Sequence, residues 1–115
     1  MMAATPTVAG AVAAEVQELS IETILAHHSE LNGKIVRFRG RLVSGGMGNQ
    51  ALCSGDTPQA KCLWFGGSGI FRDALKRDPG AKRFIVQGRL NDECIRQACT
   101  DMFAEIEDAT IVSQY

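Results

Sequence analysis

The chain has 115 residues, of which 45% are hydrophobic and 22% charged, with a formal net charge of -1. This size fits one globular domain and excludes two, and the near-neutral charge excludes a global field that would collect nucleic acid or an anionic membrane. No run of about 20 apolar residues occurs in the sequence, so we expect no membrane-spanning helix.

Residues 1–16 are small, mildly apolar and free of Lys and Arg. They show neither a helical nor a strand period, which is typical of a disordered tail. The alternative is a remnant of a secretory signal, because Ala11-Val12-Ala13 fits an A-x-A cleavage signature. In both interpretations a single folded domain covers residues 17–115.

A short amphipathic helix is predicted over residues 21–31. Ser20 is a favourable N-cap, Glu22 lies in the first turn where the helix dipole favours an anion, and apolar residues recur at helical spacing. Asn32-Gly33 ends the helix and turns the chain. This helix should cover one barrel opening or one face of a sheet.

The clearest strand signal is a phrase that occurs twice, as K-I-V-R-F-R-G-R-L at residues 34–42 and as K-R-F-I-V-Q-G-R-L at residues 82–90. Both segments alternate apolar and polar residues, which indicates half-buried strands. Each carries an inward glycine, Gly40 or Gly88, and such a glycine marks a bulge, a bend or a close approach of another backbone. Two long strands bent at an inward glycine predict a small β-barrel.

The remaining elements complete the order helix, three strands, helix, two strands. The first strand extends to residue 44, and a glycine-rich loop over residues 45–49 follows it. The other expected elements are strands over 50–53 and 61–65, a helix that begins at Ser68 or Gly69 and ends at Asp78-Pro79-Gly80, and strands over 82–90 and 102–112, the last with a bend or bulge at Asp108.

This order, with a helix between the third and fourth strands, resembles the OB-fold, a five-stranded, partly open Greek-key barrel. The phrase that begins at Gly33 and its echo at residues 81–90 resemble strands one and four of small, exported bacterial OB-fold-like domains. The resemblance spans about residues 20–112 and implies a mostly β barrel with two short helices. The competing fold is a small α+β sheet with helices on one side.

Four cysteines bear on the cellular compartment. Cys53 and Cys62 flank one turn-rich loop, and Cys94 and Cys99 flank a second short segment, so each pair lies across a predicted hairpin. Cross-strand Cβ atoms are about 4.5–5.5 Å apart, which suits a disulfide. We expect these two disulfides and a periplasmic or secreted protein, with a lipid anchor in the precursor as a variant. The alternatives are four reduced thiols in a cytosolic protein and a zinc site, for which the cysteine spacing is a poor match.

Candidate contact residues lie on the first and third strands. Arg37, Arg39 and Arg41 alternate on the outer face of the first strand, where they suit phosphate or a carboxylate-rich partner. The alternative is a solvated sheet face that discourages edge aggregation. In the third strand one of Trp64 and Phe65 must face outward, unless Trp64 packs against the adjacent disulfide.

Together with Met47 in the glycine-rich loop, these residues predict a non-catalytic module of the bacterial cell envelope that binds a protein partner. One alternative is a cytosolic OB domain that binds single-stranded nucleic acid, which is disfavoured because few aromatic side chains are available for base stacking. Another is an inhibitor or immunity-type protein that blocks an envelope enzyme. No arrangement of nucleophiles, histidines or carboxylates predicts catalysis, and no cofactor is expected. His27 and His28 point about 100° apart on the predicted helix, so no metal site is expected.

Overall fold

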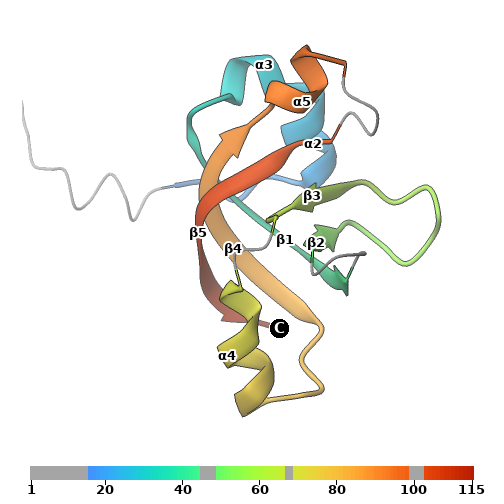
Figure 1. Cartoon of the computed structure of the whole chain (residues 1–115), viewed down its shortest axis with the longest axis vertical. Helices are drawn as coiled ribbons and strands as arrows, with labels where there is room; N and C mark the ends of the chain where they lie inside the picture. Colours follow the sequence, from blue (N-terminus) through green and yellow to red (C-terminus); the bar gives the residue numbers. More distant parts are fainter. Residues whose placement is uncertain (1–15, 45–48, 67–68, 99–102) are drawn as a thin grey trace, which may run out of the picture.

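The computed structural model describes residues 16–44, 49–66, 69–98 and 103–115, and the structural statements below concern these residues. Helices lie at the two ends of a curved sheet (Figure 1). In chain order the elements are helices α2 (Ile21–Ala26) and α3 (His28–Leu31), strands β1 (Ile35–Ser44), β2 (Gln50–Cys53) and β3 (Cys62–Trp64), helix α4 (Ile70–Arg77), strand β4 (Arg83–Asn91), helix α5 (Glu93–Arg96) and strand β5 (Glu105–Gln114).

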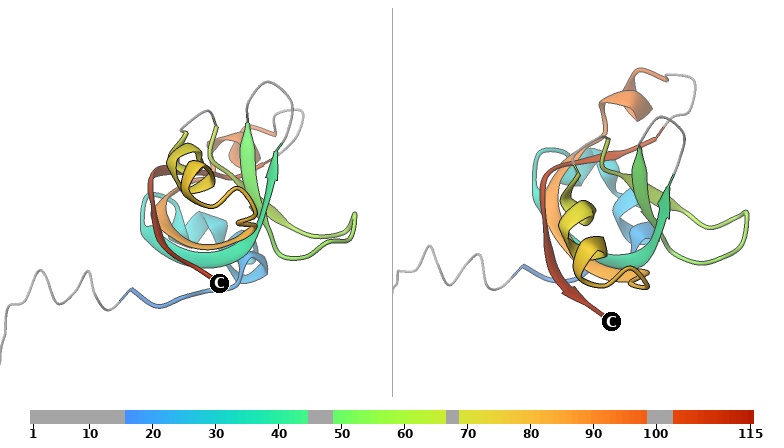
Figure 2. Two further views of the ribbon diagram at one scale, coloured as in Figure 1. Left: turned by 90° about the horizontal axis from the view of Figure 1, so that it is seen from below. Right: turned by 60° about the horizontal axis from the view of Figure 1, so that its bottom comes forward.

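The five strands close into a barrel in the order β1-β2-β3-β5-β4, and Figure 2 shows the curved sheet from its lower end. Neighbouring strands are antiparallel except β3 and β5, which run parallel and pair only at Trp64 and Glu105. This short seam matches the partly open barrel of an OB-fold. The predicted fold class is therefore confirmed, and the competing α+β sheet is wrong because the sheet closes on itself.

Gly40 and Gly88 both lie inside the barrel. A Cβ atom at Gly40 would lie 2.8 Å from the backbone oxygen of Cys53, and one at Gly88 would lie 2.4 Å from Cγ2 of Ile106. The two glycines therefore allow the neighbouring strand to approach closely where β1 and β4 bend. Opposite Gly88, Asp108 has a φ of 53° and the pairing register shifts, which confirms the predicted bulge in β5.

Four phenylalanine rings run through the core. Phe38, Phe65, Phe71 and Phe84 follow one another with ring centroids between 5.0 and 6.1 Å apart, and each residue is at most 3% exposed. The prediction of Phe65 as a surface contact is therefore wrong. Strand alternation places Phe65 inside the barrel and Trp64 on its outer face.

The predicted helix over residues 21–31 is interrupted. It begins as expected, because the Ser20 hydroxyl accepts a hydrogen bond from the Thr23 backbone N–H at 3.0 Å. His27 has a φ of -116° and ends α2, and α3 starts at the next residue. Two other elements also differ from the prediction: the sequence does not predict α5, and β5 begins at Glu105, after Ala104, and extends to Gln114, beyond the predicted end at residue 112.

Candidate functional site

The disulfide between Cys53 and Cys62 joins β2 to β3 and confirms that predicted pairing. Cys94 is also disulfide-bonded, while Cys99, its predicted partner, lies outside the described residues. Cys53 pairs across the sheet with Cys62 on one side and with Arg41 on the other. The bridge therefore lies on the outer face of the barrel and holds the β2–β3 hairpin in register.

Two half-buried aromatic residues, Trp64 and Phe103, lie at the seam between β3 and β5 and line the same hollows there. Trp64 ends β3, and its backbone N–H donates to the carbonyl oxygen of Ala104 at 3.1 Å. Phe103 belongs to the connection between β4 and β5, directly before Ala104. The parallel seam thus brings together two aromatic side chains that are far apart in the sequence.

Two adjoining hollows share this aromatic pair. The acidic hollow has a volume of about 370 Å³ and is lined by Asn49, Trp64, Gly66, Phe103 and Glu105. The basic hollow has a volume of about 410 Å³, and its lining includes His28, Lys61, Trp64 and Phe103. Both volumes fall within the range of about 300–1,000 Å³ that is common for ligand sites. Met47 lies outside the described residues, so its predicted contact role stays a prediction.

Arg37 and Arg39 on the outer face of β1 both bind partners within the protein. Arg37 donates two hydrogen bonds to Oε1 of Gln87, at 2.8 and 2.9 Å. Arg39 donates to Glu18 at 3.0 Å and lies 4.8 Å from the centre of the Tyr115 ring. The hydrogen bond from Arg39 lowers the pKa of the Glu18 carboxyl below its usual value. Both guanidinium groups therefore already have partners within the protein.

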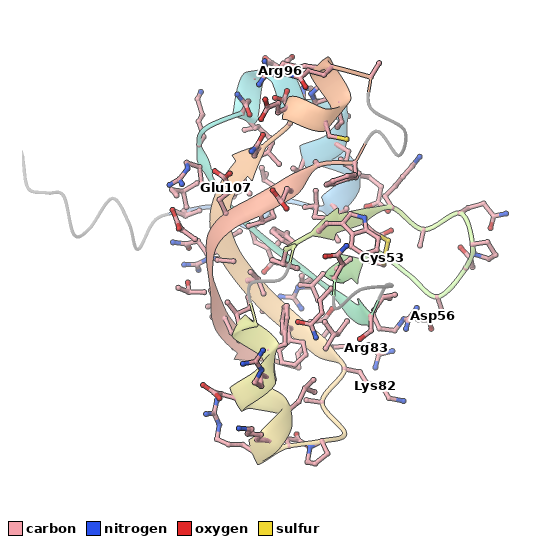
Figure 3. The ribbon with its side chains drawn as sticks, viewed as in Figure 1. Cys53, Asp56, Lys82, Arg83, Arg96 and Glu107 are labelled. Atoms are coloured by element: carbon pink, nitrogen blue, oxygen red, sulfur yellow. A yellow bond between two sulfur atoms is a disulfide. The ribbon has the colours of Figure 1, made fainter. Side chains whose placement is uncertain are left out.

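Arg41 on β1 and Arg89 on the neighbouring strand β4 form ion pairs with carboxylates. Arg41 forms an ion pair with Asp56 in the β2–β3 loop, and Figure 3 shows Asp56 beyond Cys53 at the edge of the barrel. Arg89 on β4 pairs with Asp108 at 2.6 Å and with Glu107 at 3.4 Å. The arginine surface is thus largely neutralised by acidic side chains, and the sequence alone does not predict this for Arg41.

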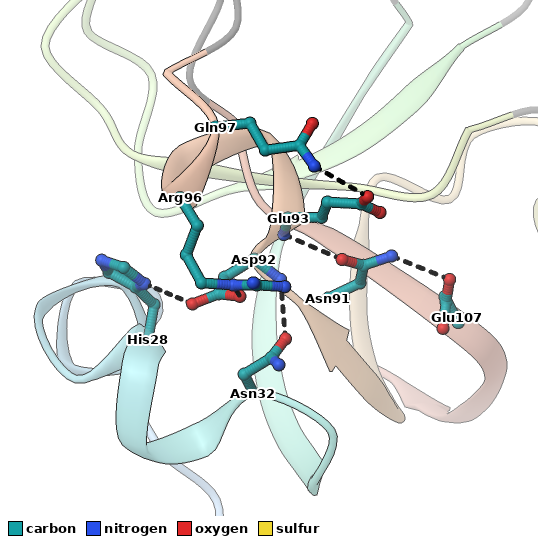
Figure 4. A network of polar contacts seen from close by, with 8 residues as sticks. All are labelled: His28, Asn32, Asn91, Asp92, Glu93, Arg96, Gln97 and Glu107. Carbon is teal, nitrogen blue, oxygen red and sulfur yellow. Dashed lines mark hydrogen bonds and ion pairs between the residues drawn. The ribbon is translucent and has the colours of Figure 1, made fainter.

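Asp92 anchors the connection that leads from β4 toward Phe103. Its side chain is fully buried; Arg96 Nε donates to one carboxylate oxygen at 2.6 Å, and Nδ1 of His28 lies 2.7 Å from the other (Figure 4). Its backbone N–H donates to Oδ1 of Asn32 at 3.0 Å. Burial by itself would raise the pKa of Asp92, but the hydrogen bonds from Arg96 and His28 outweigh it and hold that pKa below its usual value.

Three carboxylates lie near this connection, and their surroundings differ. Glu107 accepts a hydrogen bond from Asn91 at 2.9 Å, and Glu93 accepts one from Gln97 at 3.2 Å (Figure 4). The side chain of Glu105 has no hydrogen bond or ion pair with the described part of the chain. Its carboxylate is therefore the one of these three that is available to a ligand in the acidic hollow.

Sequence reasoning finds Trp64 but not the residues that surround it. Phe103, Glu105 and Asn49 join the site only because the parallel seam brings β5 beside β3. The available signal was the OB-like order of elements, since ligands of OB-folds lie against the second and third strands and the loops that follow strands one and four.

No group of three or more His, Cys, Asp or Glu residues that could hold a metal ion occurs within the described ranges. In the same ranges, no helix is both long enough and apolar enough to span a membrane.

No protein-family model and no curated protein sequence matches the chain. Among solved structures, it is similar to a "putative nucleic acid-binding lipoprotein" from Klebsiella pneumoniae subsp. pneumoniae MGH 78578, with a TM-score of 0.54 and 18% identity over 94% of this chain and 100% of that one. At this identity the likeness shows a shared fold.

Two aminoacyl-tRNA synthetases are more distantly similar. They are asparaginyl-tRNA synthetase from Pyrococcus horikoshii, with a TM-score of 0.48, and a "putative aspartyl-tRNA synthetase" from Leishmania major Friedlin, with a TM-score of 0.45; each is 14% identical to this chain. The matches cover 87% and 88% of this chain but only 24% and 21% of the synthetases, so the chain spans less than a quarter of their length.

Proposed function

We propose that the protein is a non-catalytic OB domain that binds single-stranded nucleic acid at the seam between β3 and β5. The observation that carries this proposal is the aromatic pair, Trp64 and Phe103, which lines two adjoining hollows of ligand size. The pair lies on β3 and in the β4–β5 connection, where OB-folds bind oligonucleotides. Bases stack on exposed aromatic faces with little dependence on sequence.

The charges around the aromatic pair determine how much phosphate contacts can contribute to the affinity for a strand. Arg37, Arg39 and Arg41 are engaged within the protein, so they are poor candidates for phosphate contacts. Lys61 lines the basic hollow beside Trp64 and is the cation best placed for the backbone of a stacked strand. One or two phosphate contacts reduce affinity only roughly three- to sevenfold between 50 and 200 mM salt. We therefore expect stacking to contribute more to affinity than phosphate contacts.

The compartment that this proposal implies is an oxidising one outside the cytoplasm. The disulfide between Cys53 and Cys62 supports it, because structural disulfides persist in oxidising compartments and are rare in the cytosol. The similar Klebsiella protein is described as a lipoprotein, which agrees with a location in the cell envelope. A periplasmic or secreted location is thus part of the proposal.

The protein-binding function predicted from the stripe of Arg37, Arg39 and Arg41 on β1 gains no support from the comparisons. It also loses its main physical argument, because the stripe is neutralised by Glu18 and Asp56 and hydrogen-bonded to Gln87. Binding of nucleic acid, which the sequence disfavours for want of exposed aromatic residues, is the better proposal because Phe103 provides the second one.

The test is a titration of the purified protein, with its disulfides intact, into a fluorescein-labelled single strand of about 12 nucleotides, a length within the range of OB-fold site sizes. Anisotropy reports binding, and quenching of Trp64, the single tryptophan, reports stacking. Trp64→Ala and Phe103→Ala should each weaken binding by about 1–3 kcal/mol, the usual contribution of one stacked base.

Ile35→Ala is the matched control. Ile35 is an apolar residue that is 48% exposed, but it begins β1, whereas the other end of β1 pairs with β2 beside Trp64. It should leave the affinity unchanged. A protein that binds no single strand at 50 mM salt, or that binds equally well without either aromatic side chain, would contradict the proposal.

A further inference from the structure

We infer that the acidic hollow is a base-reading pocket that selects guanine, with Glu105 as the specificity-determining residue. This inference rests on the proposed function, since it assigns a preferred base to the same site. Stacking on Trp64 and Phe103 by itself would accept any base, and a carboxylate beside the stacking surface adds a hydrogen-bonding requirement.

The position of Glu105 is set by the fold. It pairs in register with Trp64 across the parallel seam, so its side chain starts beside the aromatic residue. Oε2 of Glu105 lies 2.9 Å from the place where a Cβ atom at residue 66 would stand. Gly66 therefore leaves the space that the carboxylate occupies, and its φ of 59° is one that other residues rarely adopt.

The carboxylate of Glu105 has capacity for a ligand. Glu105 is half-buried, and its carboxylate has no partner in the described part of the chain, whereas Glu93 and Glu107 accept hydrogen bonds from Gln97 and Asn91. A half-buried acceptor without a partner gains from a donor that enters the hollow. Because the group is negatively charged, it also keeps the phosphates of a bound strand out of this hollow and favours the side where Lys61 lies.

Among the bases, guanine matches this acceptor best. An ionised carboxylate has two acceptor oxygens and no donor. Guanine presents two adjacent donors, its N1–H and its N2 amino group, which suit a bidentate, charge-assisted pair of hydrogen bonds. Thymine and uracil present one N–H between two carbonyl oxygens that the carboxylate repels, and cytosine and adenine present one amino group beside an acceptor nitrogen. The expected order is guanine first and thymine or uracil last.

The test compares strands of twelve thymidines with strands in which one central thymidine is replaced by guanosine, cytidine or adenosine, using anisotropy and the intact protein. The guanosine strand should bind about 5- to 150-fold more tightly than the all-thymidine strand, the discrimination typical of one good bidentate pair. Replacing that guanosine with inosine, which lacks the N2 amino group, should remove most of the preference without any change in the protein.

Glu105→Gln should also remove the preference, because its amide group replaces one of the two acceptor oxygens with a donor. Glu93→Gln is the matched control, because Glu93 is an exposed carboxylate of the neighbouring connection, and it should keep the preference. Equal binding of all four strands, a preference for another base, or a guanine preference that survives Glu105→Gln would each overturn the inference.

These outcomes differ from failure of the proposed function. A protein that binds all four strands equally but loses affinity on Trp64→Ala would keep its function as a nucleic-acid-binding domain and lose only the guanine pocket. A protein that binds none of the strands would lose both.

Discussion

Replacing Gly88 with alanine should destabilise the barrel by about 2–3 kcal/mol. The added Cβ atom would lie 2.4 Å from Cγ2 of Ile106 and 2.9 Å from the carbonyl oxygen of Glu107. Favourable carbon–carbon contact begins near 3.5 Å, so the overlap with Ile106 is about 1 Å. The Ile106 methyl group can move by a rotamer change, but the Glu107 oxygen belongs to the β5 backbone. Overpacking costs about 1–3 kcal/mol, and a backbone obstacle places Gly88 at the upper end of that range.

Urea and thermal unfolding, followed by circular dichroism and by the fluorescence of Trp64, measure this effect. For a domain of this size 1 kcal/mol corresponds to about 4 °C in Tm, so Gly88→Ala should unfold roughly 8–12 °C below the wild type. Gly55→Ala is the matched control, because the nearest atom to its new Cβ would be 4.0 Å away. It should change the free energy of unfolding by less than about 0.5 kcal/mol.

The same Gly88→Ala change made in an Ile106→Ala variant separates the contact with the Ile106 side chain from the contacts with the β5 backbone. In Ile106→Ala the Cγ2 methyl group is gone, so adding Gly88→Ala there leaves the close contacts with the β5 backbone, at the Glu107 oxygen and the Ala109 Cα, and part of the loss should remain. If Gly88→Ala unfolds at the same urea concentration as Gly55→Ala, the reasoning that β4 needs an inward glycine for the close approach of β5 is refuted.

Other changes test the disulfide, the buried carboxylate and the seam. Replacing Cys53 and Cys62 together with serine should lower the free energy of unfolding by about 2–3 kcal/mol, because the bridge closes a loop between residues nine apart in sequence; an unchanged urea midpoint would contradict this. Asp92→Asn should cost about 2–3 kcal/mol at pH 6 through the weakened hydrogen bonds to charged groups. Because the folded-state pKa of Asp92 is lowered, its contribution is complete above the unfolded value of about 3.9 and is lost as the pH falls through the folded value; the difference in urea midpoint from the wild type should therefore shrink below about pH 4, and a difference that grows there would show the sign to be wrong. Gly66→Ala should cost about 1–2 kcal/mol, since its φ is 59°, and should weaken the guanine preference because the new methyl group displaces Glu105; a variant with the wild-type preference would show that Gly66 does not position the carboxylate.

Much of the barrel could be predicted because strand alternation is a local property. Side chains alternate between the two faces of a strand, so a run such as residues 34–42 identifies its inward residues without knowledge of its neighbours. The same reasoning predicted the inward glycines, the bulge at Asp108 and the pairing of Cys53 with Cys62. It could not decide between Trp64 and Phe65, because alternation says only that they face opposite ways.

The candidate site depended on contacts between distant segments. Phe103 and Glu105 have no local pattern that marks them, and they acquire a role only when β5 lies beside β3. The partners of the arginines are equally non-local: Arg37 binds Gln87, and Arg39 binds Glu18. A stripe that is basic in the sequence therefore becomes largely neutral in the folded protein.

The sequence by itself determined a mostly β barrel with two bent strands and a cross-strand disulfide, because these features arise from side-chain alternation and short spacings along the chain. Only the tertiary structure decided which aromatic residue faces outward, which arginines are neutralised and which carboxylate stays available. The physical reason is that burial and ion pairing depend on the segments that the closed barrel brings together, and the parallel seam joins residues about 40 positions apart in the sequence.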